Sequence, residues 1–384
     1  MSDHWSSMPP RSLGRGAALT LVFAGVLATG AAAGSFSRTG EAAAVDSDPV
    51  PHRAGTPLRD DRAGRQGPDG AQELVSRSGD RWSAAYSARE YEGLKRSLKG
   101  EYVGVGISVR ADGRAGDQPM TVERVRRGSP AERAGVRTGD RLRAVNDKKV
   151  TGAPVTEVVA RLRDGAPGTS VELRLSRDGR TWESTLRRAK LRTPSVTVDR
   201  SVPGTVHLRV SSFTKGTGQR VRDAVREIPR GSGLLLDLRG NSGGLLTESV
   251  TAASALLDSG LLGTYEANGQ QRSLSVDGGG DTTTPVVVLV DGGTMSAAEL
   301  LAGALQDRRR AVVVGTRTFG KGTVQIPHTL EDGSVAELTV GDYATPNGRR
   351  LEGQGLLPDL LVPGGPDRTE HKGRQVLGGL AARP

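Results

Sequence analysis

The spacing of apolar residues divides the chain into segments of different character. Residues 35–82 are rich in Gly, Ser, Asp, Arg and Pro with little apolar periodicity, which predicts a disordered, flexible linker. Ser87–Gly100 has the spacing of a short amphipathic helix that closes on a glycine, within an N-terminal helical segment at 83–100. From Tyr102 onward apolar and polar residues alternate, as is typical of strands. Residues 366–384 are expected to form a C-terminal tail.

A small β-rich module is expected at residues 101–190. "SPAERAG" at Ser129–Gly135 combines a serine N-cap, a first-turn proline, a glutamate three residues after the serine and a closing glycine, which predicts a short helix. A hairpin turning at Asn146–Asp147 and a helix at Pro154–Arg163 follow. Strands are expected at 102–110, 120–126, 140–150 and 169–177.

Strands and helices alternate across residues 191–365. Gly233–Gly240 and Pro285–Gly293 begin as continuous apolar strands, and each ends in a polar, glycine-rich loop, at Arg239–Gly244 and Asp291–Thr294. This alternation predicts an α/β layered domain with a largely parallel sheet. Sites in such sheets gather at the carboxyl ends of the strands, where both loops lie.

The N-terminal residues 1–34 carry an export pattern. Arg11 and Arg15 precede the uncharged stretch Gly16–Gly34, which has a small-residue exit at Ala31–Ala33. The stretch is also barely long enough to span a bilayer, which takes about 20 residues. A cleaved signal and a retained anchor are both open, and either places the protein outside the cytoplasm, secreted or attached to the membrane.

Charge and composition exclude several kinds of site. The chain of 384 residues has a net charge of +10. The surplus is concentrated in residues 101–200, which suits nucleic acid, an anionic membrane surface or an anionic peptide end, but no recognition-helix motif or zinc-ligand spacing supports nucleic acid. Without cysteine there is no thiol nucleophile, disulfide or thiolate metal site, and the five histidines lack ligand spacing. No metal or cofactor is expected.

Ser296 stands where the polar loop after a buried strand meets a helical pattern. A serine there can be an ordinary N-cap. It can also be a nucleophile, because the free N–H groups and the dipole of a helix start stabilise an alkoxide, and the N–H of Ala297 stabilises an oxyanion. The glycine-rich "DLRGNSGG" at Asp237–Gly244 is either a plain turn or a second wall of that oxyanion hole.

A serine nucleophile needs a base, and no histidine lies in a comparable loop. Lys321, between two glycines after an apolar strand, is the alternative base, although a lysine in this setting can also be a solvated turn residue. It acts only as a neutral amine, so we expect burial to lower its pKa. Gln325 could orient the amine if the glycines bend the strand, because residues four apart in an extended strand are about 13 Å apart.

Four segments together resemble the carboxy-terminal processing, or tail-specific, serine proteases: "DLRGNSGGLL", "TMSAAELLAGALQD", "GTRTFGKGTVQ" and "YATPNGRRLEGQGLLPDL". Tyr102–Arg188 resembles the PDZ domain of these enzymes. The resemblance implies a protease core of the ClpP/crotonase-like α/β type at 191–365. It also implies a Ser296 nucleophile, a Lys321 base oriented by Gln325, and an oxyanion hole of Gly243 and Ala297.

The PDZ resemblance implies a site for protein carboxyl tails. Backbone N–H groups of "YVGVGI" would capture the terminal carboxylate, and an apolar pocket would take the last side chain. The residues implied are Gly104, Val105, Gly106 and Ile107, with Arg163 coupling tail binding to the active site. The chain departs from the family at Gly240 and Ser242, where an Asn and a Pro are usual, and the helical region before the PDZ domain is short, which leaves the oligomeric state open.

Two other functions compete with an exported endopeptidase. A catalytically silent PDZ scaffold would bind tails without cutting them, and the presence of every proposed catalytic residue argues against it. A binder of anionic surfaces or nucleic acid would show a steep salt dependence from residues 101–200.

Overall fold

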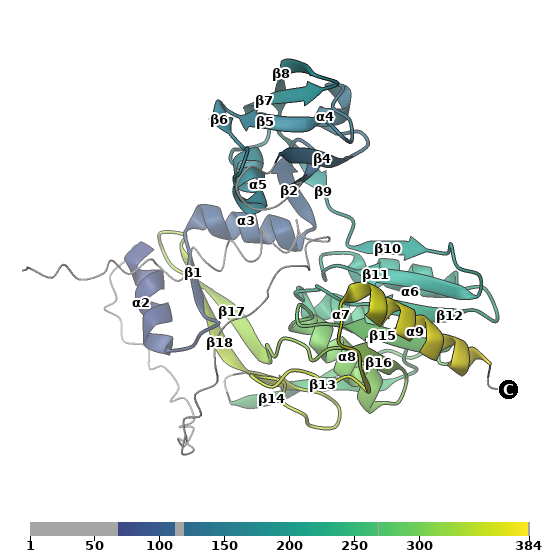
Figure 1. The fold of residues 1–384 in the computed structure, drawn as a ribbon. Helices are drawn as coiled ribbons and strands as arrows, with labels where there is room; N and C mark the ends of the chain where they lie inside the picture. Colours follow the sequence, from purple (N-terminus) through teal and green to yellow (C-terminus); the bar gives the residue numbers. More distant parts are fainter. Residues whose placement is uncertain (1–67, 112–118, 268, 383–384) are drawn as a thin grey trace, which may run out of the picture.

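The computed structural model describes residues 68–111, 119–267 and 269–382. They form an N-terminal segment, a β-rich module and an α/β core (Figure 1). Within these residues no helix is both long and apolar enough to cross a membrane. The signal or anchor expected at residues 1–34 lies outside the described residues.

The N-terminal segment packs on the core. Its elements are α2 (Pro68–Ser78), β1 (Ala84–Tyr86) and α3 (Ala88–Leu98). β1 pairs antiparallel with β18 (Val335–Ala344) of the core. The prediction that the linker extends to residue 82 is therefore wrong for residues 68–82, because their partners lie in a distant strand that local periodicity does not reveal.

Helix α3 begins as its sequence predicts. Ser87 Oγ accepts the N–H of Glu90 at 3.3 Å, and the Glu90 carboxylate accepts the N–H of Ser87 at 2.9 Å. This capping box satisfies N–H groups that the first helical turn leaves without partners.

The β-rich module is an antiparallel sheet in the order β3-β4-β5-β7-β8, with β6 beside β5 and a separate pair β2-β9. Its elements are β2 (Glu101–Gly104), β3 (Ile107–Ala111), β4 (Met120–Val125), α4 (Pro130–Arg133), β5 (Arg141–Val145), β6 (Lys148–Lys149), α5 (Val155–Arg163), β7 (Ser170–Arg177), β8 (Arg180–Arg187) and β9 (Ala189–Arg192). Both predicted helices are confirmed. Asn146 and Asp147, with φ of +48° and +61°, form the predicted turn between β5 and β6.

The α/β core is built on a six-stranded sheet in the order β10-β11-β12-β15-β16-β19. β10 is antiparallel to β11, and the other neighbours are parallel, as the sequence predicts. The elements are β10 (Val196–Asp199), β11 (Thr205–Val210), α6 (Thr217–Arg226), β12 (Gly233–Asp237), α7 (Leu246–Ala253), β15 (Val286–Val290), α8 (Ala297–Asp307), β16 (Val312–Gly315), β19 (Leu360–Leu361) and α9 (Pro366–Ala381). Every residue of β12 and β15 is buried, because helices cover both faces.

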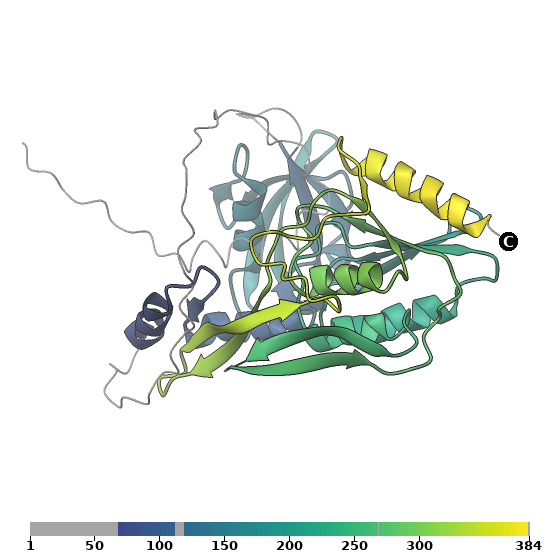
Figure 2. The same ribbon diagram turned by 90° about the horizontal axis from the view of Figure 1, so that it is seen from below.

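The two faces of this sheet bury different side chains. Leu234, Leu236 and Val288 pack with α6, α7 and α8 in the larger core. Leu235 and Leu289, which alternate with them, pack with α9. Figure 2 shows α9 across the sheet from α6 and α8.

The expected C-terminal tail at residues 366–384 is therefore wrong for Pro366–Ala381, which form α9. A Cβ on Gly373 would come within 2.6 Å of Leu289 Cδ2, so a glycine lets α9 lie close to the sheet. Arg239, at the end of β12, donates to the carbonyl of Pro366 and the carboxylate of Glu370, and ties α9 to the strand end. Small and polar residues interrupt the apolar periodicity of α9, so the sequence pattern does not reveal the face that the helix buries.

A second, antiparallel sheet follows the order β1-β18-β13-β14, with β17 also paired to β18. Its remaining strands are β13 (Gly260–Ala267), β14 (Gln270–Val276) and β17 (Thr323–Thr329). The loop from β16 to β17 crosses between the two sheets and carries Lys321. This crossing brings the lysine loop beside the start of α8.

Candidate active site

Ser296 immediately precedes α8, in a backbone conformation with φ of +54° and ψ of −122°. Residues other than glycine rarely adopt a positive φ of this kind, and holding such a residue there costs about 1–3 kcal/mol. The preceding loop supplies the constraint. Asp291 Oδ1 accepts the N–H groups of Gly293 and Gly240, both at 2.9 Å, and so fastens the loops after β15 and β12 to each other.

Gly243 lies against the nucleophile candidate. A Cβ on Gly243 would come within 2.9 Å of Ser296 Cβ and 3.2 Å of the Ala297 nitrogen, and its φ is +91°. Only glycine allows this approach. The N–H of Gly243 donates to Asn241 Oδ1 at 2.9 Å in this conformation. Of the two expected oxyanion donors, the N–H of Ala297 has no hydrogen-bond partner among the described residues, whereas that of Gly243 is engaged.

Glu299 connects the loops of Ser296 and Lys321, and sequence reasoning missed it. Its fully buried carboxylate accepts the N–H groups of Ser296, Gly320 and Lys321, each at 2.9 Å, and the hydroxyl of Thr318. Burial raises the pKa of Glu299 above its ordinary value, and these hydrogen bonds act in the opposite direction. The signal available was a single acidic residue inside the otherwise apolar helix "AAELLAGAL".

Lys321 is partly buried, and burial lowers the pKa of its amine below the ordinary lysine value, while Glu337, Asp80 and Glu352 oppose the shift. The direction is the one expected of a lysine base. Its Nζ lies 5.2 Å from the centroid of the Trp82 ring. No hydrogen bond joins Nζ to Ser296 Oγ among the described residues.

Tyr343 lies beside both candidate groups. Its hydroxyl donates to the carbonyl oxygen of Lys321. Burial raises the pKa of this hydroxyl well above its ordinary value, with Glu299 acting in the same direction and the Ser296 side chain in the opposite one. Tyr343 therefore fixes the backbone of the lysine loop next to the serine.

Gln325 is not brought to the lysine amine. Its amide Nε2 donates to Thr323 Oγ1 at 2.7 Å and to Thr339 Oγ1 at 3.1 Å. The pairing register of β17 with β18 shifts between Val324 and Gln325. The expected role of Gln325 as orienter stays a prediction that requires its amide to leave both threonines.

The five residues expected to bind a carboxyl tail gather in one part of the PDZ-like module. Gly104 ends β2 and Ile107 begins β3, with Val105 and Gly106 between them. The carbonyl of Val105 accepts an N–H from α4, and the carbonyl of Gly106 accepts one from the residue that follows β4. Arg163 stacks on Tyr102, with its guanidinium 5.0 Å from the ring centroid, and burial lowers the pKa of Arg163.

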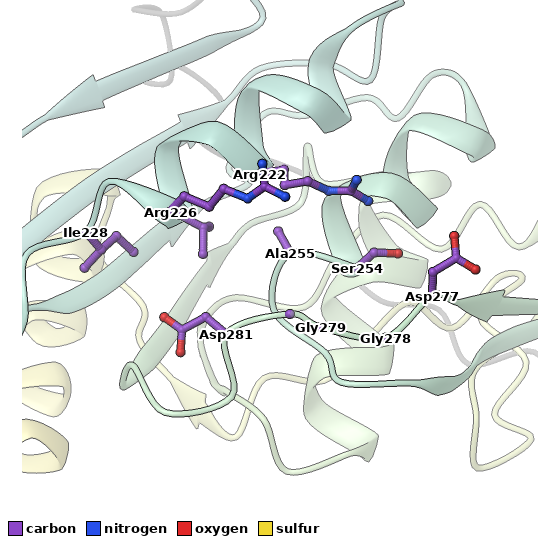
Figure 3. A pocket seen from close by; sticks show the side chains of 11 residues that line it. Arg222, Arg226, Ile228, Ser254, Ala255, Asp277, Gly278, Gly279 and Asp281 are labelled. Atoms are coloured by element: carbon purple, nitrogen blue, oxygen red, sulfur yellow. The ribbon is translucent and has the colours of Figure 1, made fainter.

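A separate cavity of about 370 Å³ lies between α6 and the loop Asp277–Asp281 (Figure 3). Arg222 and Arg226 extend along one side, and two carboxylates flank the glycines opposite. These segments precede β12 and β15, so the cavity lies at the opposite strand ends from Ser296. Among the described residues no three acidic or histidine side chains group as a metal site.

Comparison with known proteins gives the family. A model of peptidase family S41 matches residues 204–362, and a PDZ domain model matches 121–177. The chain is 32% identical over 307 residues to the carboxy-terminal-processing protease of Bartonella bacilliformis, covering 77% of this chain and 69% of that protein. The chain belongs to peptidase family S41. It is also 30% identical to the carboxy-terminal processing protease CtpA of Bacillus subtilis, over 76% of this chain and 63% of that protein, less than two thirds of its length.

Solved S41 structures agree with the fold. The photosystem II D1 C-terminal processing protease is 34% identical, with a TM-score of 0.50 over 82% of this chain and 86% of that chain. A putative S41 protease from Bacteroides fragilis is 18% identical with the same TM-score of 0.50, over 72% and 83%. The predicted fold class, an α/β protease core with a PDZ domain, is confirmed.

Proposed function

We propose that this S41 protein is an exported serine endopeptidase that recognises protein carboxyl tails through its PDZ domain and cleaves by an acyl-enzyme mechanism. The observation that carries the proposal is the shared carboxylate of Glu299, which holds the backbones of Ser296 and Lys321 in one cluster. The loops of Ser296 and Lys321, 25 residues apart in the sequence, thereby meet at the start of α8, where the N–H of Ala297 has no hydrogen-bond partner among the described residues.

In the proposed reaction Ser296 Oγ attacks the scissile carbonyl while its proton passes to the neutral amine of Lys321. The oxyanion that forms accepts the N–H of Ala297, and that of Gly243 once Asn241 releases it. The lysine then returns the proton to the leaving amine, and water repeats the cycle on the acyl-enzyme. Proton transfer needs Nζ within about 2.6–3.2 Å of Oγ, a distance that free enzymes often reach only with substrate bound.

The depressed pKa of Lys321 supports its role as base. An ordinary lysine is well under one part in a thousand neutral at pH 7, and each unit of depression raises the neutral fraction tenfold. Gln325 would take part by turning its amide from Thr323 and Thr339 to the lysine.

Tail recognition and export complete the proposal. The substrates are proteins held by a free terminal carboxylate at Gly104–Ile107, with Arg163 relaying occupancy to the core, and the reaction needs no cofactor or nucleic acid. Export rests on the pattern of residues 1–34, as a cleaved signal that leaves a secreted enzyme or as a retained anchor that leaves it on the membrane. Fractionation of expressing cells, with N-terminal sequencing of the product, distinguishes the two.

The deciding experiment measures cleavage of a protein with an apolar carboxyl tail by the full chain and by Ser296→Ala and Lys321→Ala. Both variants should lose turnover, and Ser296→Ala should lose labelling by a fluorophosphonate. The same substrate with an amidated tail should be cut more slowly. Turnover that survives both substitutions overturns the assignment, and tail binding without any turnover or labelling favours the silent scaffold.

A further inference from the structure

The chain just before β1 lies over the candidate base. Trp82 places the face of its indole ring 5.2 Å from Lys321 Nζ, and its ring centroid is 5.7 Å from that of Phe319. The segment reaches this place from outside the core: α2 and β1 lie beside β18 in Figure 1. Trp82 is far from Lys321 in sequence, so the contact exists only in the folded chain.

Glu352 fixes the indole to the lysine loop. Its Oε1 accepts the indole N–H of Trp82 at 2.8 Å, and its Oε2 accepts the N–H of Gly322 at 2.8 Å. One carboxylate therefore holds the ring and the residue next to Lys321 together. Arg81 also pairs with Oε1, from an exposed position.

The backbone of the segment is anchored on both sides of Trp82. Asp80 accepts the N–H of Ser83 at 2.7 Å and the hydroxyl of Thr339 on β18. Ala85 is paired with Ala336 in the β1–β18 ladder. These contacts restrict movement of the Trp82 ring away from the Lys321 amine.

Hydrophobic burial alone does not explain a tryptophan at this position. Trp82 and Phe319 belong to none of the hydrophobic cores of the described residues, and Phe319 is 48% exposed. The Trp82 ring instead faces the amine of Lys321, and the Phe319 ring lies against the Trp82 ring.

We propose that Trp82 is a positioning residue for Lys321, and that Asp80–Tyr86 is thereby part of the catalytic unit. The proposal rests on the proposed role of Lys321 as base. The ring excludes water from one side of the amine and holds the side chain in one place.

Two effects of the ring on the amine have opposite signs. Burial disfavours the ammonium and shifts a lysine pKa by up to about 3–5 units, whereas a ring face attracts the ammonium by roughly one unit. The charged groups facing the amine are Glu337 on β18, Asp80 before β1 and Glu352 after β18, and all three favour the ammonium. Since the net shift is downward, water exclusion dominates, and removing the ring should raise the pKa.

The test compares the full chain with Trp82→Ala, Trp82→Phe and, as a control outside this segment, Arg77→Ala on α2, whose side chain pairs with Glu73. In the Ser296→Ala background, an amine-acylating reagent and mass spectrometry give the pKa of Lys321 from its labelling across pH, without need of catalysis. Trp82→Ala should raise this pKa by about one unit. Trp82→Phe, which keeps a ring face, and Arg77→Ala should stay near the parent value.

In the enzyme with Ser296 intact, Trp82→Ala should lower kcat/KM at pH 7 about tenfold with KM unchanged, because ten times less amine is neutral. The loss should disappear at alkaline pH. An unchanged lysine pKa, or a loss equal at every pH, overturns the proposal. If the parent chain shows no Ser296-dependent turnover, the proposed function fails, and the labelling still decides whether Trp82 controls Lys321.

Discussion

Ser296 and Lys321 donate their backbone N–H groups to the same carboxylate oxygen, Oε2 of Glu299, each at 2.9 Å. The start of α8 and the lysine loop thus share one buried acceptor, and Glu299 Oε1 adds Gly320. The spacing between the candidate nucleophile and the candidate base is set through the backbone, even though no hydrogen bond joins their two side chains in this conformation.

Glu299→Gln should therefore weaken both stability and catalysis. An amide has one acceptor oxygen for these donors and turns its NH₂ toward others, so we expect unfolding to become about 2–4 kcal/mol easier and kcat to fall at least about a hundredfold. Urea unfolding and tail-substrate hydrolysis measure the two effects.

Glu248→Gln is the matched control. Glu248 also accepts two backbone N–H groups, from Gly216 and Gly218 at 2.9 and 2.8 Å, but away from Ser296. It should lose stability and keep kcat. Equal losses of kcat in both variants would show that Glu299 acts only through stability.

Removing the carboxylate of Glu337 should make Lys321 a better base at neutral pH. Glu337 stabilises the ammonium, so without it the lysine pKa falls further below 10.5. The base works when neutral, so kcat/KM rises as pH rises through that pKa, and Glu337→Gln should shift the rise to lower pH. Activity at pH 7 should increase several-fold. Glu331→Gln, in the exposed turn before β18, should leave the profile in place, and a shift to higher pH would contradict the argument.

Ser296→Gly should be more stable than Ser296→Ala. Glycine adopts φ of +54° and ψ of −122° without the steric cost that a Cβ brings. Strain of about 1–3 kcal/mol exceeds the roughly 0.5–1 kcal/mol that glycine loses in chain entropy, so the difference should be about 1 kcal/mol. Thermal unfolding of the two inactive variants measures it. An alanine variant that melts at the same or a higher temperature would show that the conformation stores no strain.

Gly106→Ala should abolish tail binding by distorting the PDZ domain. Its Cβ would come within 2.2 Å of Ser129 Cβ at a φ of +87°. We expect a loss of about 3 kcal/mol in the stability of the domain. Gly104→Ala is the milder control, because its Cβ would meet the Tyr102 ring at 3.3 Å and Arg163 Cγ at 3.9 Å, neither of which forces the backbone to move. Fluorescence anisotropy with a labelled tail peptide, free or amidated, measures binding, and an affinity of Gly106→Ala equal to that of the parent chain would exclude this turn from the site.

The sequence predicts those features that short-range rules govern. The capping box Ser87–Glu90, the turn at Asn146–Asp147 and the buried strands β12 and β15 each follow from residues within one element. Ser296 at a helix start and Lys321 in a glycine-flanked loop are also predicted in this way, because the local sequence pattern marks the same residues that the proposed chemistry needs.

Features that depend on distant partners were missed. Trp82 lies in a polar stretch of the sequence, and its contact with Lys321 forms only when β1 pairs with β18. Glu299 is a charged residue within an apolar helix, and three of its four donors come from a loop about 20 residues further on. Gln325 bonds to Thr323 and Thr339, and Gly243 bonds to Asn241. Each group has several possible partners nearby, and sequence spacing alone does not indicate which one it bonds to.

Helix α9 has a practical consequence for anyone who engineers this protein. Arg239 donates to the carbonyl of Pro366 and the carboxylate of Glu370 with the same guanidinium that pairs with Asp237. Arg239 also begins the loop whose Gly243 lies against Ser296. Ending the chain at residue 365 would remove the acceptors at Pro366 and Glu370 from the Arg239 guanidinium and would expose one face of the sheet. Affinity tags and fusion partners therefore belong beyond Ala381, and a chain shortened to end before α9 should be less stable around the loop that begins at Arg239.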